Sequence, residues 1–123
     1  MATQPYEQFV SFVYTPDLAA ARYFYETILA LPLIRDQKTC LIFKVSRDGY
    51  LGICQRENPA NVEGIIITLV TEDVDTCFKA AVQRGAEVVQ HPQQNEEYKI
   101  YHCFLKDPAG YKVEIQRFNE RLA

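Results

Sequence analysis

The sequence lacks several features that would place it in a specialised class of protein. It has no tryptophan and no apolar run of about 18 residues, so no transmembrane helix is predicted. Lysine and arginine occur singly and the formal net charge is −3, which argues against a nucleic-acid-binding surface. Residues 1–5 carry no basic and apolar signal segment, so we expect the chain in the cytoplasm.

The four cysteines form no recognisable metal-binding motif. Cys40, Cys54, Cys77 and Cys103 are widely spaced, with no Cys-x-x-Cys pair and no histidine placed to complete a zinc site. We predict reduced thiols that pack as small hydrophobic residues. A nucleophilic Cys54 or Cys103 is the alternative, although His102 and Cys103 are adjacent on a strand and should point to opposite faces.

The apolar pattern of the 123 residues predicts strand, helix and three further strands, twice over. In the first half the predicted elements are a strand at 9–14, a helix at 18–29, and extended segments at 33–35, 39–45 and 50–55. Residues 57–63 are predicted as a linker. In the second half they are a strand at 64–70, a helix from 73 to 84, and strands at 86–90, 100–105 and 111–118, with a polar loop at 91–99. The isoleucine run at 65–67 predicts that the strand at 64–70 is buried on both faces.

The two halves match at fixed offsets. Asp17 and Asp73, which both start predicted helices, are 56 residues apart, and the Gly-Tyr pairs at 49–50 and 110–111 are 61 apart. This predicts a β-α-β-β-β unit used twice, with the extra residues in the polar loop. One such unit is too small to bury both faces of its sheet, so we expect two units around a shared cleft.

Two segments of the chain resemble the vicinal oxygen chelate superfamily, which holds glyoxalase I, extradiol dioxygenases, and the fosfomycin and bleomycin resistance proteins. The first runs from the strand at 9–13 to Leu31-Pro32, with Ala30 where the family commonly has glycine. The second is Asp-Pro-Ala-Gly at 107–110, followed by a strand that carries Glu114. The resemblance implies a single α+β domain over residues 1–123. Its two β-α-β-β-β modules, about 8–56 and 64–118, would form a partly open mixed β-sheet barrel with a cleft inside and helices outside.

The resemblance also implies where a metal would be bound. In metal-dependent members the ion is held from the first and last strands of each unit, and the corresponding positions here are Val10, Ile53, Ile66 and Glu114. Only Glu114 can bind a divalent ion, and a register error of one residue adds at most a hydroxyl and a thiol. We therefore predict no family-type metal centre and no other cofactor, with a divalent ion on Glu114 as the disfavoured alternative.

Glu114 is the main candidate for chemistry. A carboxylate among aliphatic side chains suits a general acid or base, or a hydrogen-bond acceptor for a ligand. The alternative is that it is satisfied by a polar partner and retained as part of the fold. His102 lies on a predicted strand and faces the cleft or the outside depending on register. The residues predicted to bind a ligand are Val10, Phe12, Tyr50, Ile53, Ile66, Tyr101, His102, Glu114 and Gln116.

Three functions are compatible with the sequence. The first is a metal-independent small-molecule-binding protein of the bleomycin-resistance type, with an apolar cleft. The second is a lyase or isomerase similar to lactoylglutathione lyase, with Glu114 as base or sole retained ligand. A dioxygenase is less expected because the iron ligands are missing. The third is an accessory protein without a ligand. We expect a homodimer in each case, and no nucleic-acid or membrane partner.

Overall fold

In the computed structural model, which describes residues 5–122, the chain divides into two compact units. They span Met1–Pro59 and Ala60–Ala123. Residues 1–4, within the segment where no secretory signal was expected, lie outside the described part of the chain. No helix in the described part is long and apolar enough to cross a membrane.

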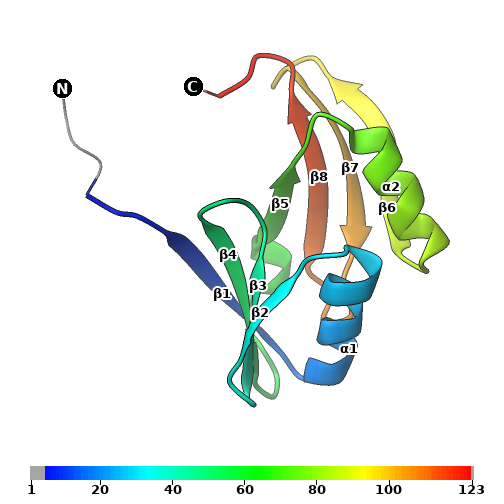
Figure 1. The fold of residues 1–123 in the computed structure, drawn as a ribbon. Helices are drawn as coiled ribbons and strands as arrows, with labels where there is room; N and C mark the ends of the chain where they lie inside the picture. The colour runs from blue at the N-terminus through cyan, green and yellow to red at the C-terminus, as the bar shows by residue number, and fades with distance from the viewer. Residues whose placement is uncertain (1–4, 123) are drawn as a thin grey trace. The chain divides into compact units, whose positions relative to one another are not determined.

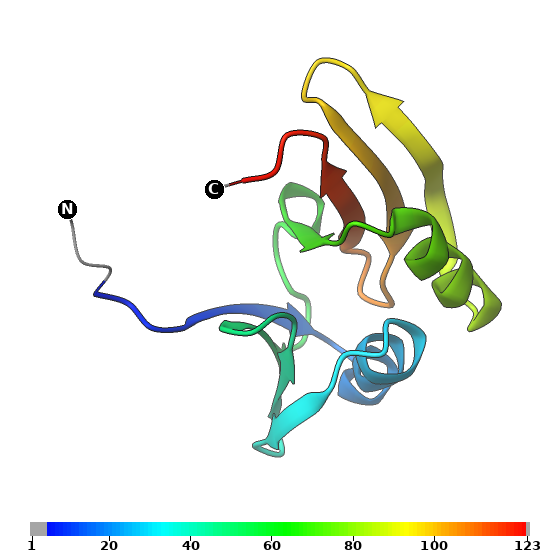
Figure 2. The same cartoon turned by 45° about the horizontal axis from the view of Figure 1, so that its top comes forward.

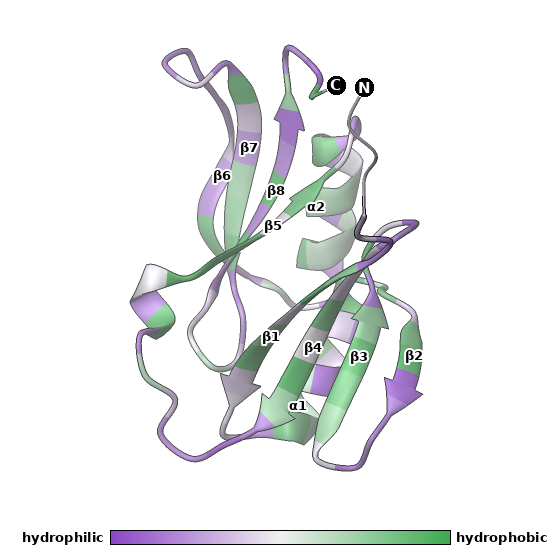
Figure 3. Cartoon of the chain, turned by 90° about the vertical axis from the view of Figure 1, so that its left-hand side faces the viewer, coloured by the Kyte–Doolittle hydropathy of each residue, from purple (hydrophilic) through white to green (hydrophobic). Residues whose placement is uncertain are grey.

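The first unit is a four-stranded sheet with one helical segment. Its strand order is β1-β4-β3-β2, in which β1 is parallel to β4 and the other neighbours are antiparallel. Figure 3 shows these strands side by side in that order. The elements are β1 (Phe9–Thr15), α1 (Leu18–Arg22), η1 (Tyr23–Ile28), β2 (Leu33–Asp36), β3 (Cys40–Lys44) and β4 (Gly49–Gln55).

The helical segment begins where the sequence predicted it. The Asp17 side chain accepts a hydrogen bond from the Ala20 amide at 3.1 Å and so caps the first turn. The segment is α-helical only to Arg22 and then widens into the π-helix η1, which the apolar spacing did not reveal. Ala30, two residues after η1, has a φ of 59°, a left-handed conformation that favours glycine.

The helical segment covers one face of the first sheet. The rings of Tyr25 and Phe43 lie 5.9 Å apart, so the face of β3 that carries Phe43 packs against the helix. Successive strand residues point to opposite faces, and on the covered face β3, β4 and the end of β1 are buried. Its buried strand residues are Val13, Leu41, Phe43, Leu51 and Ile53.

The second unit repeats this arrangement, so the predicted doubled β-α-β-β-β unit is confirmed. Its sheet order is β5-β8-β7-β6, with β5 parallel to β8. Across residues 5–122 the strands form two open four-stranded sheets, not a closed barrel. The elements are η2 (Val62–Gly64), β5 (Ile66–Val70), α2 (Val74–Gln83), β6 (Glu87–Asn95), β7 (Ile100–Lys106) and β8 (Lys112–Phe118).

Helix α2 covers one face of the second sheet. It begins at Asp73, whose side chain accepts from the Thr76 amide at 3.3 Å, and it ends before Gly85, which has a φ of 102°. Figure 1 and Figure 2 show it beside β6 and β7. Its buried residues Val74, Phe78 and Ala81 share the core with buried strand residues of this unit. These strand residues are Cys103, Leu105, Val113 and Ile115.

Two predicted features of the second unit are wrong. The polar segment 91–99 is not a loop, because β6 continues to Asn95 before the chain turns. Pro92 is tolerated there because β6 is an edge strand, and the pairing with β7 is irregular between Gln90 and Gln93. The strand β5 was expected to be buried on both faces, but Ile66 is 53% exposed because α2 covers only one face.

The prediction of four free thiols is also wrong. Cys40 and Cys54 form a disulfide between β3 and β4, while Cys77 and Cys103 are free. The two bonded cysteines lie directly opposite each other in the antiparallel register, with their Cα atoms 4.1 Å apart. Cys40 and Cys54 form no short sequence motif of the kind that marks a metal or redox site. Only the strand register brings the two residues together, so the sequence did not reveal the disulfide.

Candidate functional site

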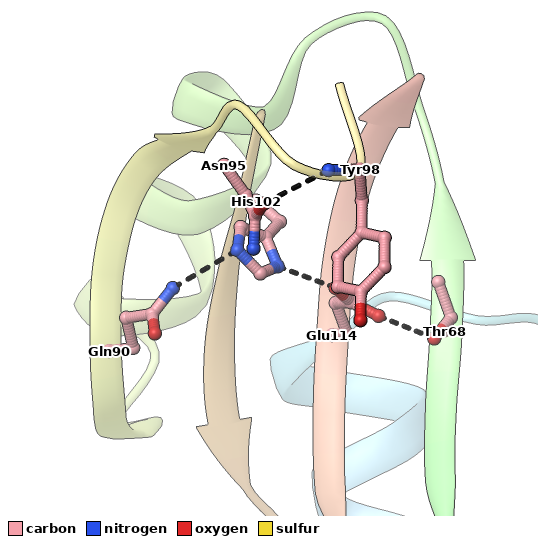
Figure 4. Close-up of polar contacts among 6 residues, drawn as sticks. All are labelled: Thr68, Gln90, Asn95, Tyr98, His102 and Glu114. Atoms are coloured by element: carbon pink, nitrogen blue, oxygen red, sulfur yellow. Dashed lines mark hydrogen bonds and ion pairs between the residues drawn. The ribbon is translucent and has the colours of Figure 1, made fainter. Parts of the chain in front are cut away.

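A network of polar side chains crosses the second sheet from edge to edge (Figure 4). The Thr68 hydroxyl on β5 donates to Oε1 of Glu114 on β8 at 2.8 Å. Oε2 of Glu114 lies 2.6 Å from Nδ1 of His102 on β7, and Nε2 of His102 lies 3.4 Å from Nε2 of Gln90 on β6. Each of the four strands therefore contributes one side chain to a continuous polar row.

The strand register explains why these side chains share one face. Thr68 lies opposite Glu114, and His102 lies opposite Gln116, two residues further along β8. Val113 and Ile115 alternate with them and point into the core beneath α2. The network therefore occupies the face that α2 leaves uncovered, and His102 lies on the same face as Glu114.

The carboxylate of Glu114 is buried and fully hydrogen-bonded. Glu114 and His102 are each 7% exposed and Gln116 is 6% exposed. With its amide nitrogen turned toward the carboxylate, Gln116 donates to both oxygens of Glu114 at 2.9 Å. Three side chains thus donate to one carboxylate, which compensates for the loss of water around a buried charge.

The network also indicates which nitrogen of His102 carries the proton. With the Gln90 amide oriented so that its nitrogen faces the ring, that nitrogen donates to an unprotonated Nε2 of His102. The proton is then on Nδ1, where it is donated to Glu114. The arrangement is an imidazole oriented by a carboxylate, which is the geometry of an acid–base pair.

Two other predicted residues of this unit lie apart from the network. Ile66 is on the same face of β5 but two residues from Thr68, and it is largely exposed. Tyr101 is on the opposite face, where its hydroxyl donates to Asp75 of α2 at 2.6 Å. That hydrogen bond raises the pKa of Tyr101. Tyr101 therefore contacts the helix and does not join the polar row.

In the first unit, the uncovered sheet face is apolar and aromatic. Val10 and Tyr50 lie opposite each other and line one shallow pocket of about 190 Å³. Phe12 is 51% exposed and its ring lies over Gly52, where an added Cβ would be 2.3 Å from the ring. Ile53 faces the helix and is 1% exposed, so it is not available to a ligand on this face.

The register corrects the sequence-based equivalence of the two units. Thr68 lies opposite Glu114 in the second unit, and Phe12 lies opposite Gly52 in the first. The residue equivalent to Glu114 is therefore Gly52, not Ile53. The error arose because Gly49 already belongs to β4, whereas β8 begins two residues after Gly110.

These residues do not fit the metal site that the resemblance implies. Phe12 and Gly52 supply no ligand atom, and Nδ1 of His102 is hydrogen-bonded to the carboxylate of Glu114. Within residues 5–122 there is no group of three or more His, Cys, Asp or Glu side chains placed to hold a metal ion. The donor set is too small for the closed shell of a divalent cation.

Comparison with known proteins agrees with the fold. A profile of the Glyoxalase/Bleomycin resistance protein/Dioxygenase superfamily matches residues 7–115. The chain belongs to this superfamily. A search of curated proteins finds no match.

Several solved structures resemble the chain at low sequence identity. A glyoxalase/bleomycin resistance protein/dioxygenase from Nocardioides has 17% identity and a TM-score of 0.73, over 100% of this chain and 93% of the other. TioX from Micromonospora sp. ML1 has 17% identity and a TM-score of 0.76, over 90% and 98%. A glyoxalase/bleomycin resistance protein from Albidiferax ferrireducens T118 has 24% identity and a TM-score of 0.69, over 89% and 96%. At these identities the likeness supports the fold alone.

Sequence reasoning missed two members of the polar row, Thr68 and Gln90. Thr68 lies within an otherwise aliphatic strand. It is 56 residues after Phe12, a predicted ligand-binding residue, and this offset between the two units could have identified Thr68 as a site residue. Gln90 was placed at the end of a short strand, although β6 continues past it. Its partnership with His102 depends on the irregular β6–β7 register, which the sequence does not show.

Proposed function

We propose that this superfamily member binds a small organic molecule without a metal ion. The observation that carries the proposal is the buried pair of Glu114 and His102, 2.6 Å apart on the sheet face that α2 does not cover. In the absence of a fitting metal-ligand set, this buried pair is a preorganised hydrogen-bonding group. The ligand then carries a polar group that interacts with this network.

The first unit carries an apolar and aromatic surface of its own. Its uncovered face presents the ring of Phe12 over Gly52, with Val10 and Tyr50 lining a pocket. An exposed ring held against the sheet offers a flat stacking surface.

A second candidate function is a metal-free lyase or isomerase. The specific observation in its favour is the geometry of His102 and Glu114. Nδ1 of His102 is 2.6 Å from the carboxylate, and Nε2, whose contact with Gln90 is long at 3.4 Å, is the basic position. In this reaction the imidazole would accept a proton from an acidic carbon of the ligand, and Glu114 would stabilise the imidazolium that forms. The two candidates share the site and differ in whether a proton is transferred.

Screening by thermal shift in the presence of a chelator tests the binding proposal. A panel of small organic acids, aromatic compounds and thioether conjugates is tested against the protein and against Glu114→Gln. The proposal expects at least one compound to raise Tm without metal, and the Glu114→Gln variant to lose most of that shift. Glu120→Gln is the matched control, because Glu120 is an exposed carboxylate of the same unit. Stabilisation that requires an added divalent ion would contradict the proposal.

Proton transfer is tested separately with a bound compound in deuterated water. The enzyme alternative expects deuterium to enter the acidic carbon position, and both His102→Gln and Glu114→Gln to slow that exchange. If binding occurs and no exchange is detected above the uncatalysed rate, the binding function stands alone.

We also propose a homodimer. Exposed apolar residues remain on the uncovered faces of both units, among them Phe12 at 51% and Val70 at 61% exposure. Association of two copies would remove such surface from water. Light scattering at micromolar concentration is expected to give twice the mass of the chain, and a monomer over that range would count against it.

A further inference from the structure

The Cys40–Cys54 disulfide lies on the uncovered face of the first sheet. Leu41, Phe43 and Ile53 alternate with the two cysteines and face the helix. Cys40 and Cys54 are only half-buried, whereas their covered neighbours are almost completely buried. The bond is therefore on the solvent side of the sheet.

Backbone hydrogen bonds between β3 and β4 hold the two cysteines opposite each other. Pairing of β3 with β4 places Cys40 directly opposite Cys54. Next to this pair, the Gln55 amide donates to the Thr39 carbonyl at 2.8 Å, and the Gln37 amide donates to the Cys40 carbonyl at 2.8 Å. These backbone hydrogen bonds do not depend on the disulfide, so the two thiols remain neighbours after reduction.

The guanidinium of Arg56, two residues after Cys54, lies over the ring of the β1 residue that pairs with Cys54. Tyr14 of β1 lies opposite Cys54, and the Arg56 guanidinium lies 4.2 Å above the centre of the Tyr14 ring. A nearby cation favours the thiolate form of a cysteine, which is both the nucleophile and the better leaving group in exchange.

We propose that Cys40 and Cys54 form a reversible thiol–disulfide exchange site for a small monothiol such as glutathione. The monothiol thiolate attacks one sulfur, the protein S–S bond breaks, and the other cysteine leaves as a thiolate that takes up a proton. A second monothiol then attacks the mixed disulfide. Two monothiols are oxidised to one disulfide, and the protein disulfide is reduced to two thiols. Glutathione disulfide reverses the sequence.

The test uses the whole chain, without denaturant, equilibrated in glutathione buffers of increasing reduced fraction. Free thiols are trapped with N-ethylmaleimide and located by peptide mass spectrometry, and far-UV circular dichroism is recorded on the same samples. We expect Cys40 and Cys54 to gain label together across the series while the circular dichroism spectrum is unchanged. A sub-denaturing urea concentration should leave the labelling rate within about twofold, since exchange from the folded state needs no unfolding.

Two single variants provide a second readout. Each of the variants Cys40→Ser and Cys54→Ser keeps one member of the pair. That cysteine is expected to take up one glutathionyl group from glutathione disulfide, and Cys103 is expected to take up none. The proposal is overturned if the pair becomes labelled only as the circular dichroism signal is lost, or if no buffer in the series oxidises the pair. A remaining thiol that reacts no faster than buried Cys103 would also overturn it.

Discussion

The buried hydrogen bonds of Glu114 predict a large and non-additive effect on stability. Replacing Glu114 with Leu removes the acceptor for the His102 ring and the Gln116 amide, both of which are buried. Each buried donor without a partner costs about 1–3 kcal/mol. Thr68 is exposed, so water replaces its lost partner. We expect Glu114→Leu to lower the free energy of unfolding by about 2–5 kcal/mol, because the added apolar contact offsets part of the loss.

A second substitution shows that this loss arises from the network. His102→Phe combined with Glu114→Leu replaces both members of the pair by apolar groups, so one unpartnered donor is removed. The double variant should therefore be more stable than the sum of the two single effects implies, by about 1–3 kcal/mol. Glu120→Gln, which removes only an exposed ion pair with Lys99, should change stability by less than about 1 kcal/mol.

Urea unfolding followed by far-UV circular dichroism measures the wild-type protein, the two single variants, the double variant and Glu120→Gln, and equal slopes with urea check that the comparison is valid. Hydrogen exchange of the β7 and β8 amides assigns the loss to the second unit. If the single effects add within about 0.5 kcal/mol, then Glu114 and His102 are not energetically coupled and the network described above has no energetic role.

Three further predictions concern single sites. Ala30→Gly removes the strain of an alanine in the left-handed conformation and should raise the free energy of unfolding by about 1 kcal/mol in urea titrations. Ala60→Gly is the control and should give no increase, since Ala60 does not have a positive φ. Gly52→Ala should displace the Phe12 ring from the sheet, visible as shifted ring resonances by NMR, and unchanged resonances would contradict the ring's position. Burial raises the pKa of the Cys103 thiol from 9.0 to about 11, so its thiolate fraction at pH 8 should be about a hundredfold below that of an ordinary thiol. As the pH rises, the Cys103 thiol therefore loses its proton in the unfolded chain before it does so in the folded protein. The contribution of this thiol to the free energy of unfolding should be intact below pH 9 and should fall as the pH rises toward 11, and Cys103→Ala should lack this fall.

The sequence was sufficient for the architecture because that information is local and repeated. Apolar periodicity and the helix caps at Asp17 and Asp73 defined the elements, and the offset of 56 residues showed that they occur twice. The failures were of two kinds. The π-helix η1 has the same apolar positions as an α-helix, and the edge strand β6 is polar enough to resemble a loop.

The site was harder to predict because it depends on strand register. An error of one residue in the alignment of the two units made Ile53, which faces the core, the expected equivalent of Glu114. The strand register shows that the equivalent residue is Gly52. The same dependence hid the Cys40–Cys54 disulfide, since the two residues meet only across the hairpin. Glu114 itself was found because it is a carboxylate at a position that a recognised family uses for chemistry.

The central claim is that Glu114 and His102 bind a small molecule without a metal ion. It is tested most directly by NMR titration of chelator-treated, isotope-labelled protein with a compound from the thermal-shift screen. We expect the largest shifts at Thr68, His102, Glu114 and Gln116 in the absence of metal, and at least tenfold weaker binding to Glu114→Gln. Shifts that occur only after nickel, zinc or manganese is added, or equal affinity of Glu114→Gln, would contradict the claim.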